Sequence, residues 1–148
     1  MVLFNSVFEN ALRVLHILVI IEKKLTLERI VSIDFISIYG KDFGVSKINL
    51  HGNNSYNFSE FSLKREQIKK ALKLLVLEGY VTPKYLKKGF FYMITKKGKN
   101  YCNRFNNNYS ETLSTTIKNI GMKYENLSDR RLTNLVNEMA ILSIGSGI

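Results

Sequence analysis

The chain has 148 residues, a formal net charge of +10, one cysteine and 45% hydrophobic residues. This length suits one domain, or one domain with a helical extension. The single cysteine, Cys102, excludes an internal disulfide. The longest apolar run, residues 14–21, is shorter than the roughly 20 residues of a membrane span. The N-terminus lacks the pattern of a signal peptide, so we expect a cytoplasmic protein with no membrane partner.

The first predicted helix follows Ser6. Ser6 and Glu9 have the spacing of a capping box, in which each side chain accepts a hydrogen bond from a free backbone N–H. Apolar residues then cover more than half of the helix circumference, which is more than one neighbouring element covers. We therefore expect part of this helix to contact another subunit. The predicted partner-binding residues are Phe4, Phe8, Leu12, Leu15 and Val19.

A second helix is predicted from residue 27 to about residue 39, with Thr26 as its N-cap. Residues 31–38 alternate as a strand does, but their apolar positions also fit a helical stripe, and Gly40 is a natural stop. We interpret the segment as a helix. Residues 40–59 are rich in glycine and asparagine and are predicted to form a long loop, either a binding loop or a disordered insertion.

Residues 62–98 carry the clearest pattern in the chain. An amphipathic helix is predicted first, with a glycine at its end, Gly79. Two short strands, 80–82 and 90–95, are predicted to flank a lysine-rich turn that contains the only proline, Pro83. Helix, strand, turn and strand in this order indicate a winged helix-turn-helix. The expected fold class is therefore mostly α with a small β-wing (α+β), and Thr95 is expected to open the next helix.

The positive charge is concentrated in the same stretch. Residues 62–99 contain 11 basic and 2 acidic residues, so they supply +9 of the total of +10. A positive helix next to a positive wing is typical of a surface that binds a polyanion, most often a nucleic-acid backbone. The alternative is a solvated lysine face that keeps the protein soluble. The predicted nucleic-acid-binding residues are Lys64, Arg65, Lys69, Lys70, Lys73, Lys84, Lys87 and Lys88.

The winged-helix domain is expected to span residues 1–105, and residues 106–148 are expected to form a C-terminal helical extension. Ser110 and Ser128 are the predicted caps of two amphipathic helices in this extension. Such helices pair with each other or with a partner subunit. Their predicted apolar faces consist of Leu113, Ile117, Ile120 and Tyr124, and of Leu132, Leu135, Val136, Met139 and Leu142.

The sequence offers little catalytic chemistry. His16 lies in an apolar helix and is predicted to be a buried structural histidine, while His51 lies in the loop. Asp34 is expected to accept a hydrogen bond from the following loop and not to act as an acid or base. No glycine-rich phosphate loop and no metal-ligand spacing is present. We therefore expect a protein with no catalytic site, no metal and no cofactor.

Several short motifs follow one another between residues 4 and 109. They consist of Phe4, Asn5, Ser6, Phe8, Glu9, Leu12 and Arg13; Leu27, Arg29, Ile30, Val31, Asp34 and Phe35; Gly40, Asp42, Phe43, Gly44, Leu50 and His51; Lys64, Arg65, Glu66, Ile68, Ala71, Leu72, Leu74 and Leu75; and Gly89, Phe90 and Tyr92. In order and spacing they resemble the small middle component of bacterial ABC-three-component systems, of which the Lamassu anti-phage defence group is the best-known example.

The resemblance implies a non-catalytic accessory subunit with a winged-helix domain. Such a subunit joins a coiled-coil ATPase of the SMC/Rad50 type to an effector, often a nuclease, and holds DNA near the ATPase heads. The alternative is a dimeric winged-helix transcription regulator, in which the helix around residues 64–73 reads the operator. A regulator of that kind needs a self-complementary dimer, whereas a subunit of an asymmetric complex does not.

Overall fold

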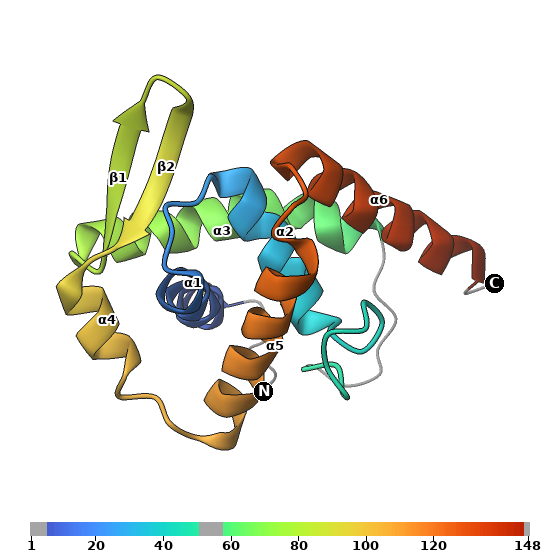
Figure 1. Ribbon diagram of the computed structural model, residues 1–148, viewed down its shortest axis with the longest axis horizontal. Coiled ribbons are helices and arrows are strands. Elements are labelled where there is room, and N and C mark those ends of the chain that lie inside the picture. Colours follow the sequence, from blue (N-terminus) through green and yellow to red (C-terminus); the bar gives the residue numbers. More distant parts are fainter. Residues whose placement is uncertain (1–5, 51–57, 147–148) are drawn as a thin grey trace.

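The computed structural model describes residues 6–50 and 58–146 of the chain (Figure 1). Most of this part is helical, and the remaining regular structure is one two-stranded antiparallel sheet, which confirms the predicted α+β class. In chain order the elements are α1 (Val7–Ile21), α2 (Leu27–Ile38), α3 (Phe58–Leu77), β1 (Val81–Leu86), β2 (Gly89–Ile94), α4 (Lys96–Cys102), α5 (Asn108–Tyr124) and α6 (Asp129–Ser146).

The first two helices begin where their caps predict. The Ser6 side chain accepts a hydrogen bond from the Glu9 N–H, and the Thr26 side chain accepts one from the Arg29 N–H. α2 is a helix and not a strand, as expected. Every residue of α2 from Ile30 to Ile38 is buried, so polar and apolar positions alike face protein. This complete burial explains why the helical period was weak in the sequence.

α3 packs through the apolar stripe that the sequence predicts. Ile68, Ala71, Leu72 and Leu75 are all buried. After the helix, Gly79 adopts a left-handed conformation with φ of 80°, as predicted for a helix stop. The predicted loop extends two residues too far, because α3 already begins at Phe58.

The β1–β2 hairpin is longer than expected and projects from the helical body (Figure 1). Its register runs from Val81 opposite Ile94 to Leu86 opposite Gly89, so only two residues form the turn. Pro83 was predicted to lie in the turn, but it lies in β1. A proline is tolerated there because β1 is an edge strand and needs no partner on its outer side.

The connection between α1 and α2 joins the sheet at one position. The Leu25 N–H donates to the Tyr92 carbonyl at 3.0 Å, and the Tyr92 N–H donates to the Leu25 carbonyl at 2.8 Å. This bridge ties the base of the hairpin to the helices, so the hairpin is fixed at its base.

The C-terminal helices belong to the same hydrophobic core as the first three helices. α5 packs against α1 and α2, and α6 packs against α2 and α3. The core therefore crosses the boundary that was expected at residue 105. The predicted apolar positions of α5 are buried, but Asn107 caps this helix instead of Ser110, because the Asn107 side chain accepts the Ser110 N–H. Ser128 caps α6, as predicted.

The described part of the loop after α2 is held by specific contacts. Phe43 and Val45 are buried, and α5 holds their carbonyls through Lys123 and Asn119. Residues 51–57 of the predicted loop, including His51, lie outside the described residues. Within residues 6–50 and 58–146, no helix combines the length and the apolar character that crossing a membrane requires.

Candidate nucleic-acid and partner interfaces

Lysines on the solvent face of α3 form the first part of the candidate nucleic-acid surface. Lys69, Lys70 and Lys73 are exposed, as expected for the side of α3 opposite its buried stripe. Lys69 lies 3.7 Å from Glu66, and both side chains are about half exposed or more, so this pair is weak. The three ammonium groups are therefore accessible to an anionic ligand.

Lys64 was predicted to bind nucleic acid, and the structure excludes it from the surface. Its side chain is 0% exposed, and its Nζ lies 3.3 Å from Asp34 Oδ2. Lys64 precedes Ile68 by four residues, so it falls on the buried face of α3 and not on the basic face. The same spacing was available in the sequence. The burial of Lys64 was not predicted, because a lysine is rarely fully buried unless it is paired.

Asp34 holds Lys64 and Arg13 together inside the core. Arg13 Nε lies 2.7 Å from Asp34 Oδ1, and all three side chains are fully buried. Burial alone would raise the pKa of Asp34, but the charges of Arg13 and Lys64 outweigh it and hold that pKa below its usual value. We call Arg13, Asp34 and Lys64 the buried charge cluster. It joins α1, α2 and α3, so the prediction that Asp34 bonds to the following loop was wrong.

Arg65, which was also predicted to bind nucleic acid, already pairs with two carboxylates. Its Nε lies 2.9 Å from Glu28 Oε1, and its Nη1 lies 3.8 Å from Glu66 Oε1. The side chain is half exposed, so it lies on the surface but shares its charge with two acidic neighbours. Arg65 therefore contributes less free positive charge than the lysines on the same helix.

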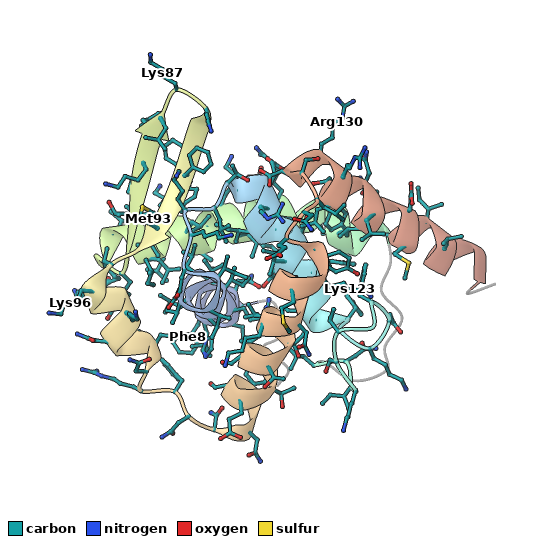
Figure 2. The ribbon with its side chains drawn as sticks, viewed as in Figure 1. Phe8, Lys87, Met93, Lys96, Lys123 and Arg130 are labelled. Atoms are coloured by element: carbon teal, nitrogen blue, oxygen red, sulfur yellow. The ribbon has the colours of Figure 1, made fainter. Side chains whose placement is uncertain are left out.

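The hairpin supplies the second part of the basic surface. Lys84, Lys87 and Lys88 are all exposed, and Figure 2 shows Lys87 pointing outward from the tip. A groove of about 460 Å³ lies between the hairpin and α3. Its lining combines three lysines of α3 with apolar and aromatic side chains. The lining residues are Glu66, Lys69, Lys70, Leu72, Lys73, Val76, Leu77, Pro83, Phe90 and Tyr92.

The predicted partner-binding residues on α1 differ in how far they are exposed. Phe8 is 61% exposed, and Leu12 and Val19 are half-buried. Leu15 is only 1% exposed, so it belongs to the core and offers no accessible contact surface. Phe4 lies outside the described residues.

Phe8 and Leu12 border a second groove, of about 230 Å³, between α1, α3 and α4. Leu74 of α3 lines this groove and is exposed, but it is not among the predicted partner-binding residues. Leu77, which follows at the end of α3, is also exposed. Exposed leucines opposite a buried stripe are the signal that could have identified them.

His16 and Cys102 are buried structural groups. His16 is buried, as predicted, and its Nδ1 lies 2.7 Å from the Leu12 carbonyl oxygen. Burial lowers the pKa of His16, and the Leu12 carbonyl opposes this only in part. Burial raises the pKa of the Cys102 thiol to about 11, so the thiol stays protonated at neutral pH. Within the part of the chain that the structure describes, no three acidic, histidine or cysteine side chains gather as a metal site.

Comparison with known protein families gives one match. A family model described as "ABC-three component (ABC-3C) system Middle Component 2" matches residues 3–145. The chain belongs to this family. Middle Component 2 is by its description one component of a system with several, so this protein works with partner subunits. No curated protein and no solved structure matches the chain.

The family match confirms the resemblance to an ABC-three-component middle component. It also extends the resemblance beyond residue 109, across α5 and most of α6. The match and the shared core agree that the C-terminal helices are part of the Middle Component 2 unit. Membership of the Lamassu group stays a prediction.

Proposed function

We propose that this protein is a non-catalytic winged-helix subunit of an anti-phage defence complex of the Lamassu type. In this proposal α3 and the β1–β2 hairpin hold DNA, and α1 contacts a coiled-coil ATPase of the SMC/Rad50 type. The complex acts in the cytoplasm and includes an effector subunit, a nuclease. The observation that carries the proposal is the exposed basic surface that α3 and the hairpin form together.

The order of the elements supports a winged helix. Three helices, α1 to α3, precede a hairpin, and the connection between the first two helices bridges to β2 through Leu25. In this arrangement α3 is the recognition helix and the hairpin is the wing. The two elements flank one groove, so a polyanion lying along α3 also reaches the wing.

The charges on this surface are available for phosphate contacts. Among the described residues, no carboxylate lies within ion-pair distance of Lys70, Lys73, Lys84, Lys87 or Lys88. Lysine ammonium groups on flexible chains bind phosphates as point charges and do not distinguish sequences. We therefore propose sequence-tolerant DNA binding, which suits a subunit that detects foreign DNA better than a regulator that reads one operator.

Contact with partner subunits is supported by apolar surface that the fold leaves uncovered. Phe8 and Leu74 are exposed and line the groove between α1, α3 and α4. The two grooves share no lining residue, so in this proposal DNA and the ATPase bind at different grooves. Full burial of Asp34 in an ion-paired cluster supports a non-catalytic role, because the carboxylate has no access to a substrate.

The salt dependence of DNA binding tests the proposal. We expect the affinity of the purified chain for duplex DNA to fall steeply as salt rises, with a log–log slope of about −0.9 per phosphate contacted. Replacing Lys70, Lys73, Lys87 and Lys88 by alanine should flatten that slope by about 0.9 for each phosphate that the variant no longer neutralises.

Two exposed lysines elsewhere on the chain provide a control for the loss of positive charge. Lys47, on the loop after α2, and Lys118, on α5, are both exposed. Their replacement by alanine removes positive charge without touching α3 or the hairpin, so the slope should stay unchanged. Equal flattening by both sets of substitutions, or a slope near zero in the parent chain, would reject the proposed surface.

A further inference from the structure

The two faces of the hairpin differ in chemistry. Residues opposite each other in an antiparallel pair share a face, so Pro83 with Tyr92 and Tyr85 with Phe90 lie on one side of the sheet. Three of these four residues are aromatic. The side chains on the other face come from Thr82, Lys84, Leu86, Phe91 and Met93.

The aromatic residues form a continuous ladder along the first face. The ring centroids of Tyr85 and Phe90 are 4.5 Å apart and the rings are nearly perpendicular, at 87°. Phe90 and Tyr92 follow at 5.0 Å and 65°. Such edge-to-face contacts fix the rings relative to one another. We call Tyr85, Phe90 and Tyr92 the aromatic ladder.

The ladder runs from the groove beside α3 out into solvent. Phe90 and Tyr92 line that groove together with Lys69, Lys70 and Lys73. At the outer end Tyr85 is 84% exposed, close to the lysines of the hairpin tip. The ladder therefore has one end beside the lysines of α3 and an open ring, Tyr85, near the lysines of the hairpin tip.

An exposed aromatic ring together with lysines favours one class of polyanion over the others. The phosphates of duplex DNA need only the lysines, because paired bases are stacked on one another and expose only their edges. The carboxylates of an acidic peptide also pair with the lysines, but they offer no flat ring on which the Tyr85 side chain can stack. Unpaired nucleotides present both phosphates and open base faces, and proteins that bind single strands combine a positive groove with aromatic side chains.

We propose that the aromatic ladder stacks on the bases of single-stranded nucleic acid while the flanking lysines contact its phosphates. The inference rests on the proposed function, since the same lysines hold the backbone. Beyond the proposed function, the inference states that the preferred ligand has unpaired bases, as at a frayed end or a gap. The open Tyr85 ring is the first stacking position.

Binding of an oligothymidine of about 16 nucleotides to the full chain, measured by fluorescence anisotropy, tests this inference. Tyr85→Ala should weaken binding roughly five- to 150-fold, which corresponds to about 1–3 kcal/mol. Tyr85→Phe keeps the ring and should bind as the parent chain does. Leu86→Ala is the matched control, because Leu86 is the neighbouring exposed residue on the other face of the hairpin, and it should have little effect.

An abasic oligomer of the same length separates stacking from charge. It keeps the phosphates and lacks the bases, so the parent chain should bind it at least as weakly as Tyr85→Ala binds oligothymidine. Tyr85→Ala should then cause no further loss, as expected when both changes remove one interaction. Equal affinity of the parent chain for the abasic oligomer and oligothymidine would overturn the inference.

Two further outcomes distinguish this inference from the proposed function. Salt-dependent duplex binding through the lysines, with no effect of Tyr85→Ala on oligothymidine, leaves the proposed function intact and rejects the stacking site. Polyglutamate that binds as tightly as oligothymidine and loses the same factor with Tyr85→Ala also rejects it, in favour of an acidic protein partner. A chain that binds no nucleic acid overturns both proposals.

Discussion

Lysines of one helix have opposite roles in this protein. Lys64 lies in the core and neutralises Asp34, whereas Lys69, Lys70 and Lys73, one to three turns further along α3, lie in solvent. The two groups differ only in their position relative to the buried stripe of α3. Net charge therefore does not measure the size of a binding surface, because part of the charge holds the fold together.

A buried ion pair and an exposed ion pair also contribute differently to the stability of the fold. The side chains of the buried charge cluster are fully buried, so solvent does not replace a partner that is removed, and loss of the shared carboxylate is costly. The side chains of Arg65 and Glu28 are about half exposed to solvent, and such surface pairs contribute about 0–1 kcal/mol.

Asp34→Ala should destabilise the protein by about 3–5 kcal/mol, because it leaves Arg13 and Lys64 buried without their shared carboxylate. Urea denaturation followed by circular dichroism measures the change in free energy of unfolding. Lys64→Met should cost less, since Arg13 still pairs with Asp34 and methionine fills a similar volume.

Glu28→Ala is the control for this pair of substitutions. It removes an exposed carboxylate from Arg65 and should change the free energy of unfolding by less than about 1 kcal/mol. If Asp34→Ala and Glu28→Ala had equally small effects, the buried charge cluster would not hold α1, α2 and α3 together.

α1 also has one exposed and one buried residue among those predicted to bind a partner, Phe8 and Leu15. Leu15→Ala should cost about 2–5 kcal/mol in unfolding free energy, because the residue is buried. Phe8→Ala should cost far less, since the ring is largely exposed, but it should weaken co-purification with the ATPase partner. Thermal unfolding and pull-down from co-expression measure the two effects. A pull-down that Phe8→Ala leaves unchanged, in a folded chain, would remove Phe8 from the partner surface.

The smallest effect concerns pH. Burial lowers the pKa of His16 in the folded state, so the unfolded state binds the proton more readily. The contribution of neutral His16 to stability is present above about pH 6.5 and is lost as the pH falls through the lowered folded pKa. Each pH unit between the two pKa values costs up to about 1.4 kcal/mol.

Chemical denaturation at several pH values from about 7 to about 5 measures this loss, because that range crosses the unperturbed pKa of histidine and stays above those of the carboxylates. His16→Gln does not titrate and should flatten the dependence. Asp34 has a lowered pKa, so its own contribution is present above its unfolded pKa of about 3.9 and is lost only at more acidic pH. An unchanged slope in His16→Gln would show that other groups are responsible.

Local sequence signals located the caps and most elements of the fold. Ser6, Thr26 and Ser128 cap the helices that they were predicted to cap, and Gly79 ends α3. Hydrogen bonds between neighbouring residues decide these positions, so the surrounding residues suffice to predict them. The length of the hairpin was missed, because cross-strand pairing from Val81 to Leu86 overrides the turn preference of Pro83.

The sequence by itself determined where helices begin, which face of α3 is apolar and where the positive charge is concentrated. Only the tertiary structure decided which charged side chains face one another across helices that are distant in the chain. Arg13, Asp34 and Lys64 meet because α1, α2 and α3 pack together, and a fully buried charge is stable only in the presence of such a partner. The aromatic ladder likewise depends on the register of β1 against β2, which brings Tyr85 to Phe90, and on the packing that sets Phe90 in one groove with the lysines of α3.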